Sequence, residues 1–232
     1  MKKKLLILAG VAAAMPFIQA GDITGKITVT GNPPAPVVNE MLKGDAFCSK
    51  LRTEPAMVRL FLTGPGATLG DVVVYLKDPP KKDNPAPAKD IVLDQVGCEY
   101  VPYVFAMQKG QKLIIRNSDP VMHNVNMSAA KANKPFNEAQ MPKAPDKTKM
   151  LEPEVFIPFK CDVHPWMFAY GSVFDHPYFA VSGKDGTYKI ANVPPGKYTL
   201  EVRHRKLPVV SKEITVGADG TTADVALEYK AP

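Results

Sequence analysis

The sequence predicts an all-β protein, on three observations. The chain holds 23 prolines and 16 glycines, which break helices and favour turns. Runs suited to helices are short, whereas alternating or β-branched apolar stretches recur between turn signals. Hydrophobic residues make up 45% of the 232 residues, enough for one large core or two modest ones. We therefore expect packed β-sandwiches and not a disordered chain.

Residues 1–20 are typical of a secretory signal peptide. Lysines at 2–4 precede an apolar stretch at 5–18, and Ala20 is followed by polar residues. The apolar stretch is shorter than the ~20 residues that span a bilayer, which favours cleavage over a membrane anchor. Cleavage removes three lysines and no acidic residue, and so lowers the formal net charge from +6 to +3. The sequence predicts export to the periplasm or another extracytoplasmic compartment, with no transmembrane span in the mature chain and no nucleic-acid partner.

The chain after the leader begins with a strand. Residues 23–31 alternate β-branched and polar residues, and a second strand is expected at 71–77. Between them, residues 38–60 form a mixed segment around Cys48 with room for one short helix. Residues 78–89 are polar and rich in proline, so they cannot pair in a sheet and are expected to form a linker or surface loop.

Soft metal ligands cluster in one short stretch. Cys161, His164 and Met167 follow one another at three-residue steps, and the proline after the histidine prevents a regular helix, so the side chains can converge. His123, on an alternating strand upstream, supplies a fourth ligand. Two imidazoles, a thiolate and a weak axial thioether form the ligand set of a blue (type 1) copper site. The sequence predicts one copper ion held by these four side chains.

Such a site suits electron transfer. Cuprous ion prefers soft sulfur and cupric ion prefers nitrogen, so a rigid frame that suits neither fully keeps the geometry nearly constant as the electron moves. Apolar neighbours tune the reduction potential, and Phe159, Trp166 and Phe168 are the candidates for that apolar shell.

The motif and its surroundings resemble the cupredoxins, the plastocyanin and azurin superfamily, over residues 90–176. The short Cys-x-x-His-x-x-Met loop is similar to the amicyanin-like form of the family. Residues 101–117 resemble the cupredoxin hairpin that leads into the first histidine ligand, and His123-Asn124 matches the family's His-Asn pair. The resemblance implies a Greek-key β-sandwich.

The resemblance also implies roles for residues around the metal. Asn124 would tie the two ligand loops together beside the thiolate, and Trp166 would lie in the shell around the ligands. His164 would present an exposed imidazole edge through which a redox partner protein is reached.

A second β-sandwich is indicated downstream. Residues 178–202 alternate strands with Asp-Gly and Pro-Pro-Gly turns, and they resemble the carboxypeptidase regulatory-like, transthyretin-like sandwich. Such a domain starts with a Gly-x-Ile/Val strand and continues with a Val-rich strand, which occur at 23–29 and 72–76. We therefore expect residues 21–80 and 177–232 to form one sandwich in which the cupredoxin is nested. The alternative is a sequential fusion with a separate C-terminal domain.

Three cysteines leave one pair and one remainder. Cys161 lies among the metal ligands, which leaves Cys48 and Cys98 as candidates for a disulfide in an exported protein. The alternative is that both remain buried free thiols.

The leading functional prediction is a single-copper electron carrier and not an enzyme. The alternative is a copper delivery or storage protein, although such proteins more often carry exposed Met- and His-rich runs, which this sequence lacks. An oxidase or reductase with a second copper would need further clustered histidines, and only His176 and His204 remain. We expect His176 in a turn and His204 at a solvated strand end, both structural. A binuclear copper centre would need a second cysteine beside Cys161.

Overall fold

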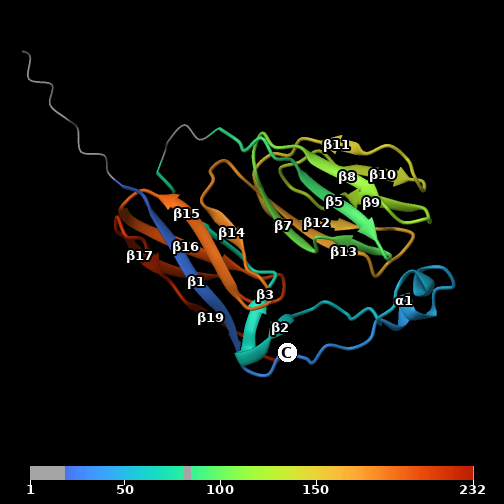
Figure 1. Cartoon of the computed structure of the whole chain (residues 1–232), viewed down its shortest axis with the longest axis horizontal. Coiled ribbons are helices and arrows are strands. Elements are labelled where there is room, and N and C mark those ends of the chain that lie inside the picture. The colour runs from blue at the N-terminus through green and yellow to red at the C-terminus, as the bar shows by residue number, and fades with distance from the viewer. Residues whose placement is uncertain (1–18, 81–84, 232) are drawn as a thin grey trace, which may run out of the picture.

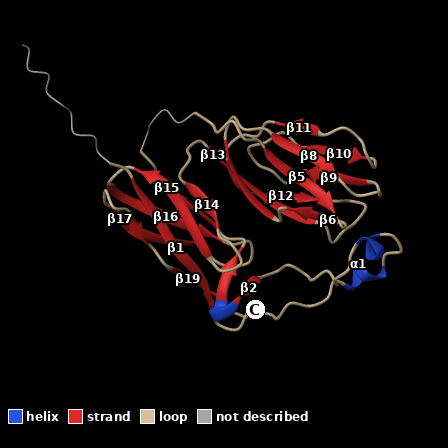
Figure 2. Ribbon diagram, viewed as in Figure 1, coloured by secondary structure: helices blue, strands red, loops and turns tan. Residues whose placement is uncertain are grey.

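The computed structural model describes residues 19–80 and 85–231, so the predicted signal peptide lies outside the described residues except for its last two. The regular secondary structure of the described residues is almost all strand, arranged in four sheets (Figure 2), and the all-β prediction is confirmed. Among the described residues, no helix is both long and apolar enough to cross a membrane.

The first sandwich combines the two ends of the described chain. One sheet has the order β15 (Thr187–Val193), β1 (Gly21–Thr30), β3 (Thr68–Gly70) and β2 (Leu62–Gly64), with β18 (Thr221–Thr222) and β19 (Val225–Glu228) also pairing with β1. The facing sheet has the order β14 (Phe179–Val181), β4 (Val73–Leu76), β16 (Gly196–Arg203) and β17 (Val210–Val216). A short 3-10 helix, η2 (Pro65–Ala67), joins β2 to β3.

Strand β1 is central to its sheet because it pairs with β15, β3, β18 and β19. Its side chains alternate between the core and solvent. Ile23, Ile27 and Val29 are buried in the core, and the residues between them are more exposed. β1 pairs antiparallel with β15 and parallel with β19. Strand β4 pairs with β14 and β16. The early strands thus complete a sheet with the late ones, which is the pairing that the nested arrangement requires.

The second sandwich lies between these segments in sequence and carries its own core. One sheet has the order β10 (Phe136–Gln140), β9 (His123–Met127), β12 (Glu154–Lys160), β13 (Phe168–Phe174) and β7 (Val104–Gln108). The other has the order β11 (Lys147–Lys149), β8 (Leu113–Asn117), β5 (Ile91–Val96) and β6 (Glu99–Val101). The hairpin expected over residues 101–117 is wrong, because β7 and β8 belong to different sheets and the chain crosses the sandwich between them.

A third buried cluster joins the two sandwiches. Val73 and Tyr75 of β4 pack against Val104 of β7 and Phe174 of β13. The rings of Tyr75 and Phe174 lie 4.8 Å apart, within the range of a favourable aromatic pair. The sandwiches are therefore in apolar contact as well as joined by the chain.

Residues 39–56, which we call the cap segment, leave the first sandwich and pack on the second (Figure 1). The segment contains α1 (Glu40–Gly44) and the 3-10 helix η1 (Cys48–Leu51). Leu42, Cys48 and Ala56 belong to the core of the second sandwich, although sequence assigned this range to the first. The cap segment is held on the second sandwich by apolar packing and also by a covalent bond, since a disulfide joins Cys48 to Cys98.

Candidate metal centre

Two neighbouring strands and one loop position the candidate ligands. His123 is the first residue of β9, and Cys161 directly follows β12, which pairs with β9 at Asn126. His164 and Met167 lie on the loop between β12 and β13. The backbone closes this loop on itself, because the amide of Cys161 donates to the carbonyl of Met167 (3.2 Å) and the amide of Met167 donates to that of His164 (2.9 Å).

The donor atoms of His123, Cys161 and His164 converge, each lying within 4.8 Å of the others. The two Nδ1 atoms are 2.8 Å apart, and Cys161 Sγ is 3.8 Å from His164 Nδ1. These separations are of the order expected for donors that share one ion through bonds of ~2.0–2.3 Å. The exposed fractions of His123, Cys161 and His164 are 0%, 2% and 8%, so the protein shields the centre almost completely from solvent. The donor set and its spacing fit a copper ion.

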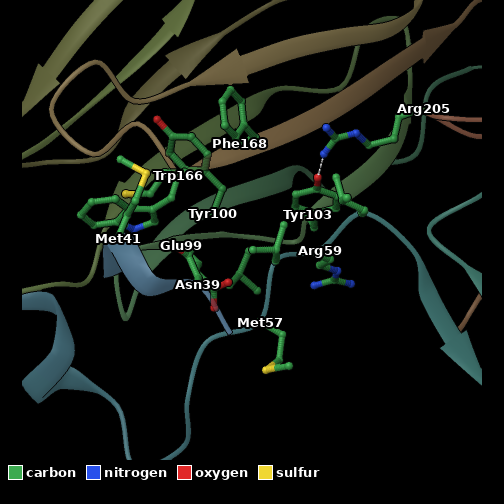
Figure 3. A pocket seen from close by; sticks show the side chains of 14 residues that line it. Asn39, Met41, Met57, Arg59, Glu99, Tyr100, Tyr103, Trp166, Phe168 and Arg205 are labelled. Carbon is green, nitrogen blue, oxygen red and sulfur yellow. Dashed lines mark hydrogen bonds between the residues drawn. The ribbon is translucent and has the colours of Figure 1, made fainter. Parts of the chain in front are cut away.

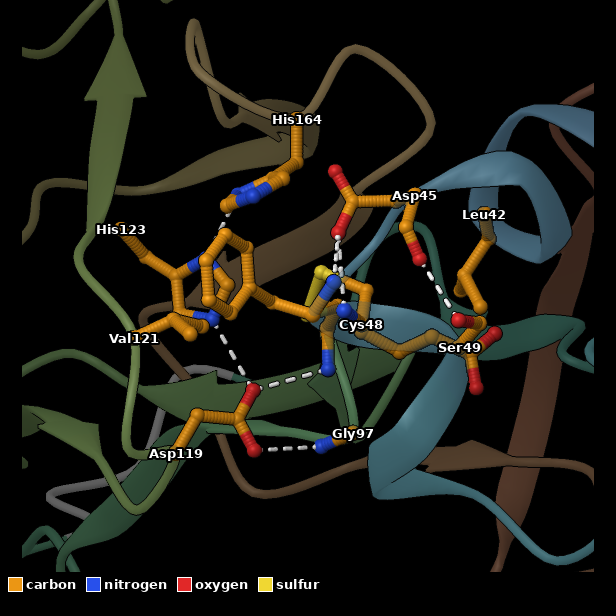
Figure 4. The surroundings of a disulfide bond; sticks show 12 residues. Leu42, Asp45, Cys48, Ser49, Gly97, Asp119, Val121, His123 and His164 are labelled. Atoms are coloured by element: carbon orange, nitrogen blue, oxygen red, sulfur yellow. Dashed lines mark hydrogen bonds and ion pairs between the residues drawn. A yellow bond between two sulfur atoms is a disulfide. The ribbon is translucent and has the colours of Figure 1, made fainter.

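Asp119 fixes the orientation of His123, and sequence reasoning missed it. Its carboxylate lies 2.9 Å from His123 Nε2 and also accepts the amides of Gly97 (2.6 Å) and Cys98 (2.8 Å), as Figure 4 shows. An ionised carboxylate only accepts, so the proton sits on Nε2 and the lone pair of Nδ1 faces His164. Burial disfavours the imidazolium, yet the bond to Asp119 gives His123 a raised pKa. The only signal in sequence was a carboxylate shortly before the histidine.

The sulfur of Cys161 sits among donors that favour a thiolate. The amide of His164 points at Sγ from 3.4 Å. Burial raises the pKa of the Cys161 thiol, but the neighbouring His123 ring and the amides of Asn124, His164 and Val163 outweigh it, and the net shift is downward. The thiolate is the form that binds metal.

Asn124 links the first ligand strand to the ligand loop. Its Oδ1 accepts the amide of Asp162 (2.8 Å) and lies 3.2 Å from Cys161 Sγ. Its Nδ2 donates to Asn137 Oδ1 (2.7 Å) and to the carboxylate of Asp162 (3.1 Å). The hydroxyl of Tyr100 donates to its carbonyl. This buried polar network holds the thiolate side of the centre rigid.

Met167 and Trp166 take different positions on the loop. Met167 is buried in the core of the second sandwich. Trp166 donates from Nε1 to the carbonyl of Cys98 (3.1 Å), and its ring lies 5.2 Å from that of His164. Of the expected apolar shell, Phe159 is fully buried, but Phe168 is 36% exposed and faces outward at the start of β13.

The exposed edge expected for His164 is absent, because the cap segment covers it. His164 is buried, and the sulfurs of Cys48 and Cys98 lie within 4.8 Å of one of its ring nitrogens. Figure 4 shows Asp45 and Cys48 of the cap segment beside the His164 ring. Asp45 holds this part of the segment in shape by accepting the amides of residues 47 and 48. The disulfide therefore fixes the cap segment beside His164.

The two remaining histidines are structural. The ring of His176 packs at a tilt against Phe174, with ring centres 5.3 Å apart, and His204 stacks on Phe61 at 5.2 Å. The solvated position expected for His204 is wrong, since it is buried and burial lowers its pKa to about 4. In the parts of the chain that the structure describes, every group of three or more potential His, Cys, Asp or Glu ligands overlaps the centre around His123, Cys98 and His164.

No protein-family model and no curated protein sequence matches the chain. Its structural neighbours are cupredoxins. The copper-containing nitrite reductase (NirK) from Thermus scotoductus SA-01 is 17% identical with a TM-score of 0.35, over 42% of this chain and 25% of that one. A reduced variant of amicyanin is 18% identical with a TM-score of 0.33, over 38% and 84%. A purple cupredoxin from Nitrosopumilus maritimus is 22% identical with a TM-score of 0.31, over 36% and 99%. The chain thus spans about a quarter of the nitrite reductase.

Proposed function

We propose that this chain is an exported, periplasmic blue copper protein that carries single electrons to or from a redox partner protein. His123, Cys161, His164 and Met167 would hold the copper ion. Bound copper supplies one-electron chemistry, and the chain itself performs no substrate chemistry. The second sandwich is a cupredoxin with an amicyanin-like ligand loop, and the first is a carboxypeptidase regulatory-like, transthyretin-like sandwich in which it is nested.

One observation carries the proposal. A thiol with a lowered pKa and two imidazoles converge in a buried centre, and the thiol and one imidazole each have a fixed partner beyond it. Asp119 holds His123, and Asn124 and the loop amides hold Cys161. A preorganised set of this kind moves little when the ion changes oxidation state, which is the requirement for an electron carrier.

The test is the visible and electron paramagnetic resonance spectrum of the purified full chain loaded with cupric ion. We expect an intense blue or green colour from thiolate-to-copper charge transfer, because Cys161 is the only free thiol in the described residues. Cys161→Ser should lose the colour and keep the circular dichroism of the folded chain. Val163→Ala, on the exposed side of the same loop, is the matched control and should keep the colour. A colourless cupric protein would refute the proposal.

The alternative, copper delivery or storage, is favoured by the covered His164. A metal ligand shielded by the cap segment is a poor contact point for a partner protein, and slow electron exchange is acceptable in a protein that only holds the ion. The two functions are separated by comparing the electron self-exchange rate with the rate at which cuprous ion passes to a chelator. Slow exchange with fast transfer would favour delivery, and the opposite pattern favours the carrier.

A further inference from the structure

A cavity of about 270 Å³ lies beside the ligand loop (Figure 3). Met167, the fourth candidate metal ligand, is one of the residues that line it. Three parts of the chain build it. The cap segment and the residues after it contribute Met41 and Met57, the second sandwich contributes Tyr100 and Trp166, and the turn after β16 contributes Arg205. The cavity therefore exists because the cap segment and the first sandwich meet the ligand loop at this point.

The walls of the cavity are largely aromatic and thioether groups. The rings of Tyr100, Trp166 and Phe168 line it together with the side chains of Met41 and Met57. Flat rings and polarisable thioethers are surfaces on which another aromatic ring packs well. Phe168 and the two methionines are exposed, so these groups are open to an incoming molecule. The wall chemistry indicates a planar ligand.

Of the charged side chains around the cavity, one cation has no acidic partner. Arg59 is paired with Asp71 through contacts of 2.7 and 3.0 Å. Glu99 is paired with Arg52 of the cap segment. Arg205, by contrast, forms no ion pair with any carboxylate in the described parts of the chain, and its polar partner is the Tyr103 hydroxyl.

Arg205 is held ready to receive an anion. Its Nη1 donates to the hydroxyl of Tyr103, and its guanidinium lies over the rings of Tyr103 and Tyr170, 4.8 Å from the latter. A guanidinium has five N–H donors in a rigid fork, and a neutral phenol takes only one of them. The group is half-buried, so a carboxylate that met it would be partly shielded from water. The single positive charge of Arg205 matches a ligand that carries one negative charge.

We propose that this cavity binds a small aromatic monocarboxylate. Its volume lies just below the ~300–1,000 Å³ of most small-molecule pockets, which limits the ligand to one or two rings. The carboxylate meets Arg205, and the ring packs toward Phe168 and Trp166. Because the ring of Trp166 contacts His164, the ligand also lies one side chain away from the candidate metal centre. The site is formed by protein groups alone, so binding can be measured in the metal-free chain.

The test uses Trp166, the only tryptophan in the chain, as its reporter. The metal-free full-length chain is titrated with benzoate while tryptophan fluorescence is recorded, and calorimetry measures the same binding. We expect a saturable change. Cyclohexanecarboxylate has the charge without the aromatic ring and benzyl alcohol has the ring without the charge, and both should bind more weakly.

Variants at Arg205 make the inference falsifiable. Arg205→Gln should weaken benzoate binding about tenfold or more, because a charge-assisted contact is lost. Lys206→Gln removes the same charge from the next residue, which is exposed, and should leave binding unchanged. Arg205→Lys keeps the charge without the fork and should fall between the two, which excludes a simple loss of folding. Absence of saturable binding to the wild-type chain, or equal affinity in Arg205→Gln, overturns the proposal and leaves the copper proposal untouched.

Discussion

Removing the disulfide should both destabilise the second sandwich and uncover the metal centre. The change is the double variant Cys48→Ala and Cys98→Ala. The bond joins residues separated by 50 positions, and in the chain-entropy description a loop of this length contributes roughly 4 kcal/mol by restricting the unfolded chain. Without it, the cap segment is retained by apolar packing of side chains such as Leu42 and by the ion pair between Arg52 and Glu99. His164 then loses its cover whenever the segment detaches.

Two measurements follow this change. Denaturant unfolding of the metal-free chain, recorded through Trp166, reports on the second sandwich because that side chain packs against its core. We expect the free energy of unfolding to fall by roughly 4 kcal/mol. Transfer of copper to a chelator should become faster in the variant. Phe47→Ala, which alters a 69% exposed neighbour of Cys48, is the control and should change neither quantity. A variant with unchanged stability and unchanged copper transfer would refute the assigned role of the cap segment.

Three further changes test the centre and its surroundings. Asp119→Asn replaces the carboxylate that orients His123, so copper affinity measured by chelator competition should fall about 10–100-fold; an unchanged affinity would show that Asp119 does not position the ligand. Met167→Leu should retain copper and raise the reduction potential, because one donor is lost and cuprous ion tolerates low coordination better than cupric ion does; equal potentials by voltammetry would mean that Met167 only packs. The folded-state pKa of His204 is lowered from 6.5 to about 4, so the folded state resists protonation and stability falls as pH drops through this window, by roughly 3 kcal/mol. His204→Asn should flatten that dependence in urea unfolding at pH 7 and pH 4, and an equally steep dependence would exclude His204 as its source.

The convergence of the candidate ligands His123, Cys161 and His164 could be predicted from sequence because much of their geometry is local. Cys161, His164 and Met167 share one short loop, and His123 begins the strand that pairs beside it. The alternating apolar residues of β1 likewise predicted a strand and which of its faces is buried. These features depend on spacing along the chain, and spacing is what a sequence displays directly.

The missed features all depend on contacts between distant segments. Asp119 matters because its carboxylate meets the amide of Cys98 and the ring of His123 at once. The cap segment has no strong periodicity, so its packing over His164 follows from the disulfide and from apolar contacts that no local pattern reveals. The hairpin failed for a related reason, since adjacency of β7 and β8 in sequence says nothing about which sheet each one joins. Arg205 lines its cavity only because the first sandwich places the turn after β16 beside the second sandwich.

The parallel pairing of β1 with β19 has a mechanical consequence. Ile27 pairs with Val225 and Thr30 with Glu228, so a stretching force applied ahead of β1 and beyond β19 pulls the two strands along their length in opposite directions. All the hydrogen bonds of that ladder then bear the load together instead of opening one after another. The ligand strands and the cap segment lie between β1 and β19 in sequence, and they carry no tension until the ladder ruptures. A chain pulled or anchored at both ends would therefore keep the candidate metal centre unloaded and folded up to the force that breaks this ladder.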